Sequence, residues 1–355
     1  MKKIFRFFIG IFTAVLLLLV CYIGYLFLSY HRLPAEQQLA VHTSPRSQLV
    51  KDKTYRAMTY NIGYGSYPPN YSFFMDGGKK ARATSKQVVR QNLNGIIQTT
   101  QQIDPTLAFY QEVDQAGDRS RHVNEVQRLK NAFPDYASVY GQNYDSSYLF
   151  YPLTEPIGKA KSGLVTLSRT TISQSRRYSL PIETDFNKFF DLDRAFTASV
   201  LPVKNGRYLI AINTHLSAYT KNKKIQQAQL DKLFTFMSAE AKKGNYVLVA
   251  GDFNHDLLGN SPQVFHTSHQ RLSWTHPFPT QQLPVEFTQP QSNLAQAKIP
   301  SARNLNEPYR KGHTLVTLID GFFVSDNITV KTVRVRDTGF AYSDHNPVEM
   351  TFSLH

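Results

Sequence analysis

Residues 246–254 read Tyr-Val-Leu-Val-Ala-Gly-Asp-Phe-Asn, and this stretch decides the fold class. An apolar run that stops at a glycine and a short carboxylate predicts a buried strand with a turn after it. Asp252 and Asn254 then stand at the end of that strand. The same pattern of an apolar run followed by small polar residues recurs along the chain.

Nine short apolar or alternating runs predict strands, at residues 55–60, 107–110, 164–167, 197–203, 208–213, 246–250, 315–324, 330–335 and 348–352. Two stretches between them have helical periodicity. Ser85 caps the first helix, and the apolar faces are formed by Val89, Leu93, Ile96 and Ile97 in the first and by Ile225, Leu233, Phe234 and Met237 in the second. Strands and helices alternate irregularly, which predicts a mixed α/β (α+β) domain whose sheets are covered by helices.

The chain begins with a segment that can span a membrane. Residues 7–28 are 22 uncharged residues, and about 20 suffice to cross the core of a bilayer. Lys2, Lys3 and Arg6 precede the segment, so the positive-inside bias predicts a cytoplasmic N-terminus at residues 1–6 and an extracytoplasmic remainder, anchored in the cell membrane by a single span. A cleaved signal peptide is the alternative, although the apolar run exceeds the ~7–15 residues of a signal core.

Residues 29–53 are polar, with Pro34 and Pro45, and predict a tether before a domain at 54–355. Two later stretches predict loops: 63–78, which is rich in aromatic residues, and 255–314, which is rich in Pro and Gln. The rings of the first loop, including Tyr71, Phe73 and Phe74, are candidates for contact with a membrane interface.

The domain is basic and free of cysteine. The formal charge is +14, and +11 remains beyond residue 28, because residues 1–28 contain no Asp or Glu. Such a surface suits nucleic acid, anionic lipid or wall polymers, or it simply holds the domain near an anionic membrane. Cys21, the only cysteine, lies in the apolar run, so only oxygen and imidazole ligands remain for a metal.

Small carboxylate, amide and imidazole side chains stand where the predicted strands end. They are Asn61, Glu112, His215, Asp252, Asn254, Asp320, Asp344 and His345. Singly, each is an ordinary turn residue. Strand ends at one edge of an α/β sheet are nevertheless the places where sites are assembled from distant parts of a chain.

Taken together and in order, these residues resemble the endonuclease/exonuclease/phosphatase superfamily, the deoxyribonuclease I-like proteins, in a membrane-anchored bacterial form. The resemblance spans about residues 55–354 and rests on Asn61, Gln111-Glu112, Thr214-His215, Gly251-Asp252-Phe253-Asn254, Ile319-Asp320 and Ser343-Asp344-His345. It implies a four-layer α/β/β/α sandwich with two packed mixed β-sheets and the site at one end of the sandwich.

The resemblance also implies a role for each residue. Asn61, Glu112 and Asp344 would hold the metal, Mg²⁺ with Mn²⁺ or Ca²⁺ as substitutes. Asp252 would orient or deprotonate the attacking water, and Asn254 would stabilise the transition state from the same side if the backbone stays extended. Asp320 and His345 would form a carboxylate–imidazole dyad, and His215 would be an acid or a phosphate ligand.

Several further residues are weaker candidates. Arg194 is expected to clamp the scissile phosphate, and Arg119 and Arg121 are expected near substrate phosphates or in solvent. Gly63 stands where several nucleases have a polar residue near the metal. The remaining histidines have no metal-ligand spacing, which predicts surface positions for His255, His266, His269, His276 and His313.

The expected function is metal-dependent hydrolysis of phosphate esters by in-line attack of water, with nuclease-like cleavage of phosphodiesters preferred. A membrane-lipid phosphoesterase, similar to sphingomyelinases or phosphoinositide phosphatases, is the alternative, and an inactive surface-binding domain is a third. The expected partners are a nucleic acid or phospholipid substrate and the membrane, and no protein partner is predicted. Superfamily membership fixes the chemistry better than it fixes the group that carries the phosphate.

Overall fold

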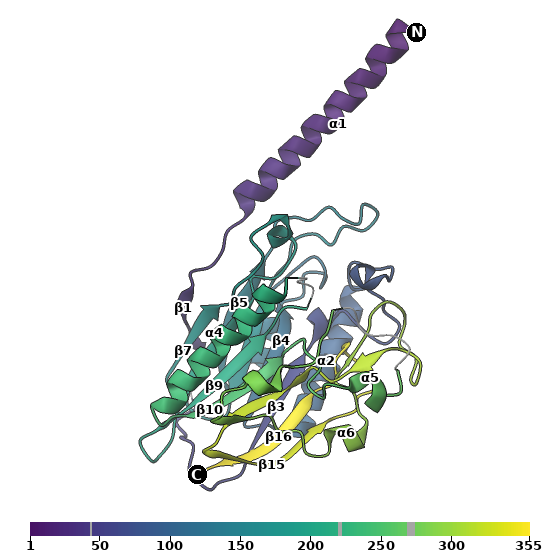
Figure 1. Cartoon of the computed structure of the whole chain (residues 1–355). Helices are drawn as coiled ribbons and strands as arrows, with labels where there is room; N and C mark the ends of the chain where they lie inside the picture. Colours follow the sequence, from purple (N-terminus) through teal and green to yellow (C-terminus); the bar gives the residue numbers. More distant parts are fainter. Residues whose placement is uncertain (43–44, 219–221, 268–273) are drawn as a thin grey trace.

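Two seven-stranded mixed sheets pack face to face in the computed structural model, which describes residues 1–42, 45–218, 222–267 and 274–355 (Figure 1). The first sheet has the order β1 (Glu36–Leu39), β7 (Gln174–Ser179), β8 (Ala195–Pro202), β9 (Tyr208–His215), β10 (Tyr246–Asp252), β14 (Asp320–Ser325), β11 (Phe287–Thr288). The second has the order β15 (Ile328–Val335), β16 (Val348–Leu354), β3 (Tyr55–Asn61), β4 (Leu107–Asp114), β6 (Lys161–Ser168), β5 (Ala137–Asp145), β2 (Val41–His42).

Helices cover the outer faces of both sheets. α2 (Lys86–Ile103) and α3 (Glu125–Ala132) pack on the second sheet, and α4 (Lys223–Lys242) packs on the first. Ser85 caps α2 through its hydroxyl, which accepts from the Val88 N–H at 3.2 Å, as the sequence predicts. The expected four-layer α/β/β/α sandwich is confirmed.

The remaining elements are short. They are the helices α5 (Ser261–Val264) and α6 (Leu294–Ala297), the 3₁₀ turns η1 (Gly63–Gly65), η2 (Phe74–Asp76), η3 (Phe186–Phe189) and η4 (Thr280–Gln282), and the strand pair β12 (Ala302–Arg303) and β13 (Val316–Thr317). Most of the predicted loop at 255–314 is therefore irregular, as expected.

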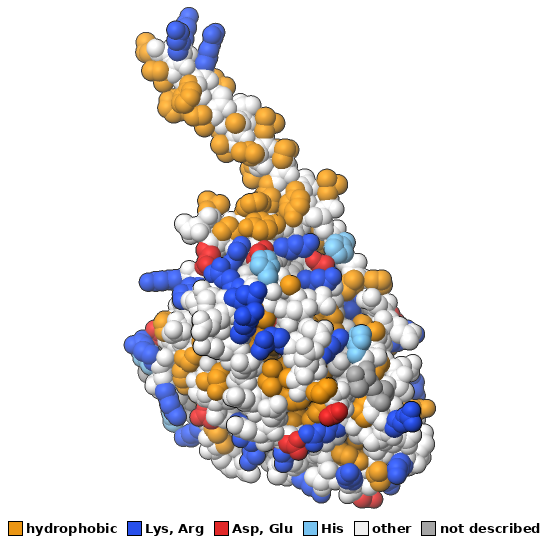
Figure 2. Space-filling model, turned by 180° about the vertical axis from the view of Figure 1, so that it is seen from behind, with side chains coloured by type: hydrophobic (Ala, Val, Ile, Leu, Met, Phe, Trp, Pro, Cys, Tyr) orange, Lys and Arg blue, Asp and Glu red, His pale blue; other side chains and the backbone are white. Residues whose placement is uncertain are grey.

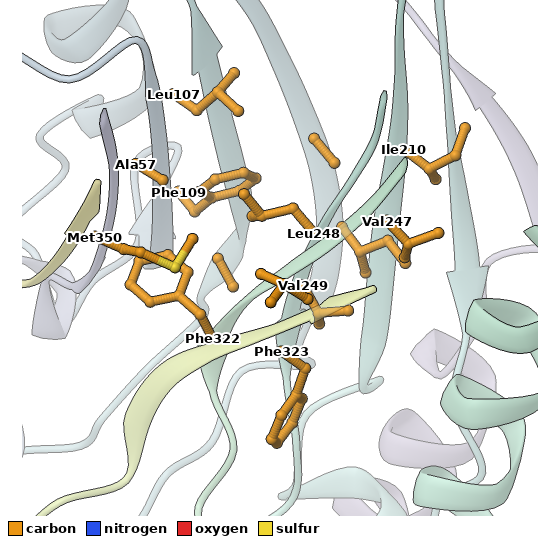
Figure 3. Close-up of a cluster of buried hydrophobic side chains, with 14 of the residues drawn as sticks. Ala57, Leu107, Phe109, Ile210, Val247, Leu248, Val249, Phe322, Phe323 and Met350 are labelled. Atoms are coloured by element: carbon orange, nitrogen blue, oxygen red, sulfur yellow. The ribbon is translucent and has the colours of Figure 1, made fainter. Parts of the chain in front are cut away.

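Alternation along β3 and β4 divides the apolar side chains between two layers. Ala57, Leu107 and Phe109 face the first sheet, where they meet Leu248 and Phe322, and Met350 of β16 lies beside Ala57 in their own sheet (Figure 3). Their neighbours Met58, Tyr60, Ala108 and Tyr110 face the opposite way and pack under α2. Successive residues of a strand point to opposite faces, so one strand supplies both cores.

Strand register brings distant polar residues into line at one end of the sandwich. β9 and β10 are parallel with His215 opposite Asp252, and β14 is antiparallel to β10 with Asp320 opposite Asp252. In the second sheet, parallel β3 and β4 place Asn61 opposite Gln111. Polar groups from both sheets therefore reach the same edge.

Six of the strands described were not predicted, and one predicted strand is broken. β1, β5 and β7 are polar or interrupted by Gly and Asn, and β2, β11 and β12 are only two residues long, so none of the six carries an apolar run. β1 and β2 lie inside residues 29–53 and pair with β7 and β5, so this stretch is not simply a tether. The run 315–324 divides into β13 and β14, and Asp320 begins a strand rather than ending one.

The N-terminal helix α1 (Lys2–Ser29) extends away from the sandwich (Figure 1). It is long and apolar enough to cross a membrane, and none of its most apolar 18-residue window is buried against the rest of the chain. A core helix of a soluble protein would bury that surface. By length and composition alone, α1 is thus a candidate membrane span.

Gly251→Ala should destabilise the protein. A Cβ at this position would lie 2.1 Å from the backbone oxygen of Thr214 on β9, and forced overpacking of this kind costs about 1–3 kcal/mol. Chemical denaturation of the variant should show a lower free energy of unfolding. The double variant Gly251→Ala/Thr214→Ala is the control: the closest atom is backbone, so trimming the threonine should not restore stability, and full restoration would contradict this account.

Candidate active site

The predicted site residues converge at the floor of one cleft of ≈ 800 Å³. Its polar lining includes Glu112, Arg194, His215, Asp252, Asn254, Asp344 and His345. Asn61 and Asp320 lie directly beneath and are buried, and both hydrogen-bond to lining residues. Residues that are up to 284 positions apart in the sequence, from Asn61 to His345, thus share one pocket.

Asn61 links carboxylates from the two sheets. Its Nδ2 donates to Asp252 Oδ2 at 2.9 Å and to Glu112 Oε1 at 3.1 Å, while its Oδ1 accepts from the Gly63 N–H at 3.0 Å. Because the backbone N–H fixes which end of the amide is oxygen, the nitrogen must face the carboxylates. Asn61 therefore positions the two carboxylates in this structure, rather than presenting its oxygen to a cation beside them.

A bulge in β4 turns Glu112 toward the cleft. The register with β6 shifts between Tyr110 and Val113, and Glu112 has a φ of 56°. A bulge of this kind re-aims one side chain out of the regular alternation. Gln111 instead points between the sheets, where its Nε2 donates to Asn213 Oδ1 at 2.8 Å. The sequence marks Gln111 only as part of the Gln111-Glu112 motif, and its contact across the sheets is visible only in the structure.

The turn after β10 fixes both Asp252 and Asn254. Asn254 has a φ of 51°, so the backbone is left-handed there, and the condition for the two side chains to face one way, an extended backbone, is not met. The Asn254 N–H donates to Asp252 Oδ1 at 2.9 Å, and its Nδ2 donates to the Leu216 carbonyl at 2.7 Å. Asparagine tolerates this backbone conformation better than most residues do. The tight turn thereby holds the Asp252 carboxylate in place.

His345 and Asp320 form the expected dyad. The His345 Nδ1 lies 2.8 Å from Asp320 Oδ2, and its Nε2 lies 3.8 Å from Asp252 Oδ2 and 3.9 Å from Asp344 Oδ2. Burial alone would lower the pKa of His345, but the charges of Asp320 and Asp344 raise it well above 6.5. The imidazole is consequently a cation at neutral pH.

His215 is the opposite case. Its Nε2 lies 3.6 Å from Asp252 Oδ2 and 3.8 Å from Glu112 Oε1. Burial, and after it the positive charge of Arg194, lowers the pKa of His215 well below 6.5. Two histidines of one cleft are therefore held in different protonation states, one neutral and one charged.

Asp344 occupies the space that a side chain at position 63 would need. A Cβ on Gly63 would lie 2.7 Å from Asp344 Oδ1, and Ser343 Oγ donates to the same oxygen at 3.2 Å. The departure from nuclease patterns at Gly63 thus has a steric reason, because the acidic group comes from Asp344 instead. Next to Asp344, Arg303 lines the cleft, and its backbone N–H donates to the backbone carbonyl of Asp344 at 3.0 Å. No sequence signal pointed to Arg303.

The three candidate arginines have different environments. Arg194 is buried, lines the cleft, and donates to the Leu216 carbonyl at 2.9 Å and to Asp191 at 3.2 Å. Arg119 also lines the cleft, but Asp114 holds its guanidinium through contacts of 3.2 and 3.0 Å. Arg121 pairs with Glu155 at 2.8 Å and is not among the lining residues. Arg194 thus lines the cleft without the two-point carboxylate contact that holds Arg119, and its role as a phosphate clamp stays a prediction.

Comparison with known proteins agrees with this geometry, since residues 58–345 match the Endonuclease/Exonuclease/phosphatase family. The chain belongs to this family. No curated protein matches it in sequence at a significant level. Among solved structures, it is similar to an endonuclease/exonuclease/phosphatase from Beutenbergia cavernae DSM 12333, with TM-score 0.51 and 17% identity over 85% of this chain and 72% of that one.

Two further solved structures share the family fold. ANGEL2, a 2',3'-cyclic phosphatase in complex with adenosine-2',3'-vanadate, has TM-score 0.56 and 14% identity over 90% of this chain and 99% of that one. Danio rerio TDP2, complexed with a single-strand DNA product, has TM-score 0.51 and 14% identity over 85% of this chain and 100% of that one. At these identities the likeness establishes the fold.

The carboxylates of this family member are crowded in a way that suits a divalent cation. Burial, and then the charge of Asp344, raises the pKa of Glu112 from 4.5 to about 7, and burial with the charge of Asp320 raises that of Asp252 from 3.8 to about 7. A bound cation would relieve this repulsion. Ligand atoms of Asp252, Asp320 and His345 also lie within 4.8 Å of one another, but the Asp320–His345 hydrogen bond already accounts for part of that closeness.

Two sequence expectations about the surroundings of the site are wrong. His255 is buried rather than on the surface, with its Nδ1 2.6 Å from the Phe253 carbonyl, and His269 lies outside the described residues. In the aromatic loop, Tyr71 and Phe73 are 0% and 8% exposed, so they are not free to touch a membrane, whereas Phe74 is half-buried, lines the cleft and has its ring 5.7 Å from that of Tyr151. These rings pack together with Tyr64, Tyr67 and Leu305 beside the cleft instead.

The metal-free protein should respond to pH through these carboxyls. Glu112 binds its proton more tightly in the folded state, so its contribution to stability is present below pH ~4.5 and is lost as the pH rises through about 7. Without metal, Glu112→Gln should therefore melt at a higher temperature than the wild type at pH ~8 and at a similar temperature at pH ~4.5. Differential scanning fluorimetry measures both.

His215, whose pKa is lowered, acts in the opposite direction in both proteins. Adding Mg²⁺ at pH ~8 should raise the melting temperature of the wild type more than that of the variant. Equal melting temperatures for the two metal-free proteins at both pH values would show that Glu112 is not under electrostatic strain.

Proposed function

We propose that this protein is a divalent-metal-dependent hydrolase of phosphate esters, with phosphodiesters as the preferred substrates, anchored in the cell membrane by α1 with its catalytic domain outside the cytoplasm. The carrying observation is the convergence of Glu112, Asp252, His345 and Arg194 on one cleft floor. The six motifs of the sequence meet at this cleft, and each carries a residue that is competent for the chemistry. This supports a catalytic protein over an inactive surface-binding domain.

Glu112 and Asp344 are the residues that would hold the cation, with Asn61 orienting the first of them. A bound Mg²⁺, or Mn²⁺ or Ca²⁺ in its place, supplies a Lewis acid to the phosphoryl group. These hard oxygen donors suit Mg²⁺, which keeps several of its waters and takes one or two carboxylates from a protein.

Asp252 is the proposed base for the attacking water. Asn61 and the Asn254 N–H each donate to one of its oxygens, which fixes the carboxylate while leaving it beside the cleft. The raised pKa of Asp252, about 7, is close to the value at which a carboxylate takes a proton efficiently at neutral pH. The attacking water would lose its proton to this group as the new P–O bond forms.

The two histidines have complementary roles in this proposal. Charged His345 would stabilise negative charge on the phosphoryl oxygens and can pass a proton to the leaving oxygen, since Asp320 keeps it protonated. Neutral His215 would donate a hydrogen bond rather than a proton, which favours the phosphate-ligand reading over the acid reading. Arg194 would bind the non-bridging oxygens.

Substitution of Glu112 should remove most of the activity. Glu112→Gln keeps the size and the hydrogen bond to Asn61 but loses the charge, so Mg²⁺-dependent hydrolysis of bis(p-nitrophenyl) phosphate should fall by about 10²-fold or more. His345→Ala should cause a loss of similar size. The wild type with a chelator gives the metal-free baseline, and full activity in both variants would show that the site lies elsewhere.

Arg194→Lys should raise KM more than it lowers kcat. Lysine keeps the charge but loses the planar fork that binds two phosphate oxygens at once, a loss felt in the ground state and the transition state alike. The matched control is Arg121→Lys, because Arg121 pairs with Glu155 outside the cleft. Steady-state kinetics of both variants decide the point: a shift of equal size in the control would argue against a specific clamp.

A further inference from the structure

Exposed apolar side chains gather around the mouth of the cleft. After α1, the described residues include eight exposed large apolar side chains: Met75, Phe150, Tyr151, Leu153, Phe186, Phe190, Tyr208 and Val285. All except Phe186, Tyr208 and Val285 line the cleft, and the Phe186 ring lies 5.6 Å from that of Phe190. We call the first six of these residues the rim. Leu153, the most exposed of them, is 84% exposed.

The rim is continuous with the end of α1. The Tyr22 ring lies 5.3 Å from the ring of Phe150 and lines the cleft itself, and the Phe27 ring lies 4.9 Å from Phe189, which contacts Phe186 at 5.2 Å. Figure 2 shows hydrophobic side chains gathered where the helix meets the body of the protein, with Lys and Arg side chains just beyond them.

Hydrogen bonds fix this junction. The Tyr22 hydroxyl donates to the Tyr148 carbonyl at 3.2 Å, and the Tyr148 N–H donates to the Tyr25 hydroxyl at 2.9 Å. Ser29 and Ser147 share a further hydrogen bond of 2.5 Å. Three contacts within eight residues of α1 hold the helix end against the loop that carries Phe150, Tyr151 and Leu153. The rim and the helix therefore form one connected surface.

The length of α1 sets the depth of this surface in a bilayer. The helix has 28 residues, which at ~1.5 Å per residue gives roughly 42 Å, against ~30 Å for the hydrocarbon core. With Lys2, Lys3 and Arg6 among the cytoplasmic headgroups, ~30 Å of helix from Phe7 ends near Leu26. Tyr25 then lies at the outer boundary of the hydrocarbon core, where tyrosine is enriched, and Tyr22 lies about one turn inside it. The Lys188 ammonium, over the rings of Phe27 and Tyr30 at 5.6 and 5.1 Å, lies at the depth of anionic headgroups.

We propose that the rim inserts into the headgroup layer of the membrane that α1 crosses, so that the cleft opens onto the bilayer and accepts the phosphodiester of a membrane phospholipid. The substrate half of this inference rests on the proposed function. The reaction is the same hydrolysis: the oxygen of water bonds to phosphorus while its proton passes to Asp252, one P–O ester bond breaks, and the leaving oxygen takes a proton from His345.

The division of the cleft into a polar floor and an apolar mouth favours a lipid over a nucleic acid. Its floor is polar and carries Arg194 and Arg303, while its mouth is apolar at Phe150, Leu153 and Phe190. An amphiphile matches this division, since its phosphate can reach the floor while its acyl chains remain against the rim. A polynucleotide extends its charge along its whole length and would cross an apolar mouth without compensation.

The test uses the full chain in vesicles of phosphatidylcholine, phosphatidylglycerol and sphingomyelin, with Mg²⁺. Phe150→Ser/Tyr151→Ser/Leu153→Ser is compared with the control Tyr208→Ser/Val285→Ser, which removes exposed apolar groups outside the rim. The readout is the ratio of lipid turnover to turnover of bis(p-nitrophenyl) phosphate. We expect the ratio to fall by about tenfold or more in the rim variant and to stay at the wild-type value in the control.

A depth measurement tests the rim without relying on catalysis. Tyr151→Trp and Tyr208→Trp are placed in vesicles that contain dibrominated lipids, which quench tryptophan by contact, and the signal of Trp274, the single native tryptophan, is subtracted. Trp at 151 should be quenched strongly and Trp at 208 weakly. Equal quenching at the two positions would overturn the docking of the rim.

The remaining outcomes separate the two proposals. An unchanged ratio in the rim variant, or a wild type that cleaves RNA or plasmid DNA but none of the vesicle lipids, overturns the lipid substrate while leaving the proposed phosphoesterase intact. A wild type that is inactive on the soluble diester as well overturns the proposed function and the lipid substrate together. The quenching result then still decides whether the rim enters the membrane.

Discussion

One amide group joins the two halves of the site. Nδ2 of Asn61 donates to Glu112, on its own sheet, and to Asp252, on the facing sheet. These bonds can form only if the C-terminal ends of β3, β4 and β10 lie at the same end of the sandwich, and the packing of the two sheets determines this alignment. A second amide contact, from Gln111 to Asn213, crosses the same gap deeper in the core. Buried polar groups that must be paired fix the relative position of the sheets more sharply than apolar contact alone.

Convergence of this kind brings like charges together. Burial and neighbouring carboxylates raise the pKa values of Glu112 and Asp252, and the same carboxylates keep His345 protonated while His215 is held neutral. Paired acids and bases with displaced pKa values are typical of sites that move protons, although structural ion-pair networks also displace them. Here the groups with displaced pKa values lie at the floor of a cleft, where a bound cation would reduce the repulsion between the carboxylates and a bound phosphate would pair with His345. This placement connects the crowding of like charges in the cleft to the proposed chemistry.

The sequence predicts most of the site residues and the central strands of both sheets, but it does not predict the outer strands. β10 is a run of apolar residues, so its existence and its end at Asp252 follow from local sequence. β1 and β7 pair at the edge of the first sheet with polar residues such as Gln37 and Arg177, so no periodic signal marks them. The interior positions of Tyr71 and His255 also escaped prediction, because burial of a polar aromatic or an imidazole depends on partners brought from elsewhere. The glycine at position 63 is likewise explained only by the structure, because Asp344 fills the space that a larger side chain would need.

The sequence by itself determined the order of the chemical groups along the chain and the apolar character of the N-terminal segment. Both are local properties: a carboxylate after an apolar strand, or 22 uncharged residues in a row, can be recognised without knowing what lies next to them. Only the tertiary structure decided that Asn61 holds two carboxylates, that Asn254 adopts a left-handed turn, and that the end of α1 meets the mouth of the cleft. The first and the third are contacts between residues distant in the chain, and the turn at Asn254 is held in part by the distant Leu216 carbonyl. Such contacts are set by packing rather than by local preference.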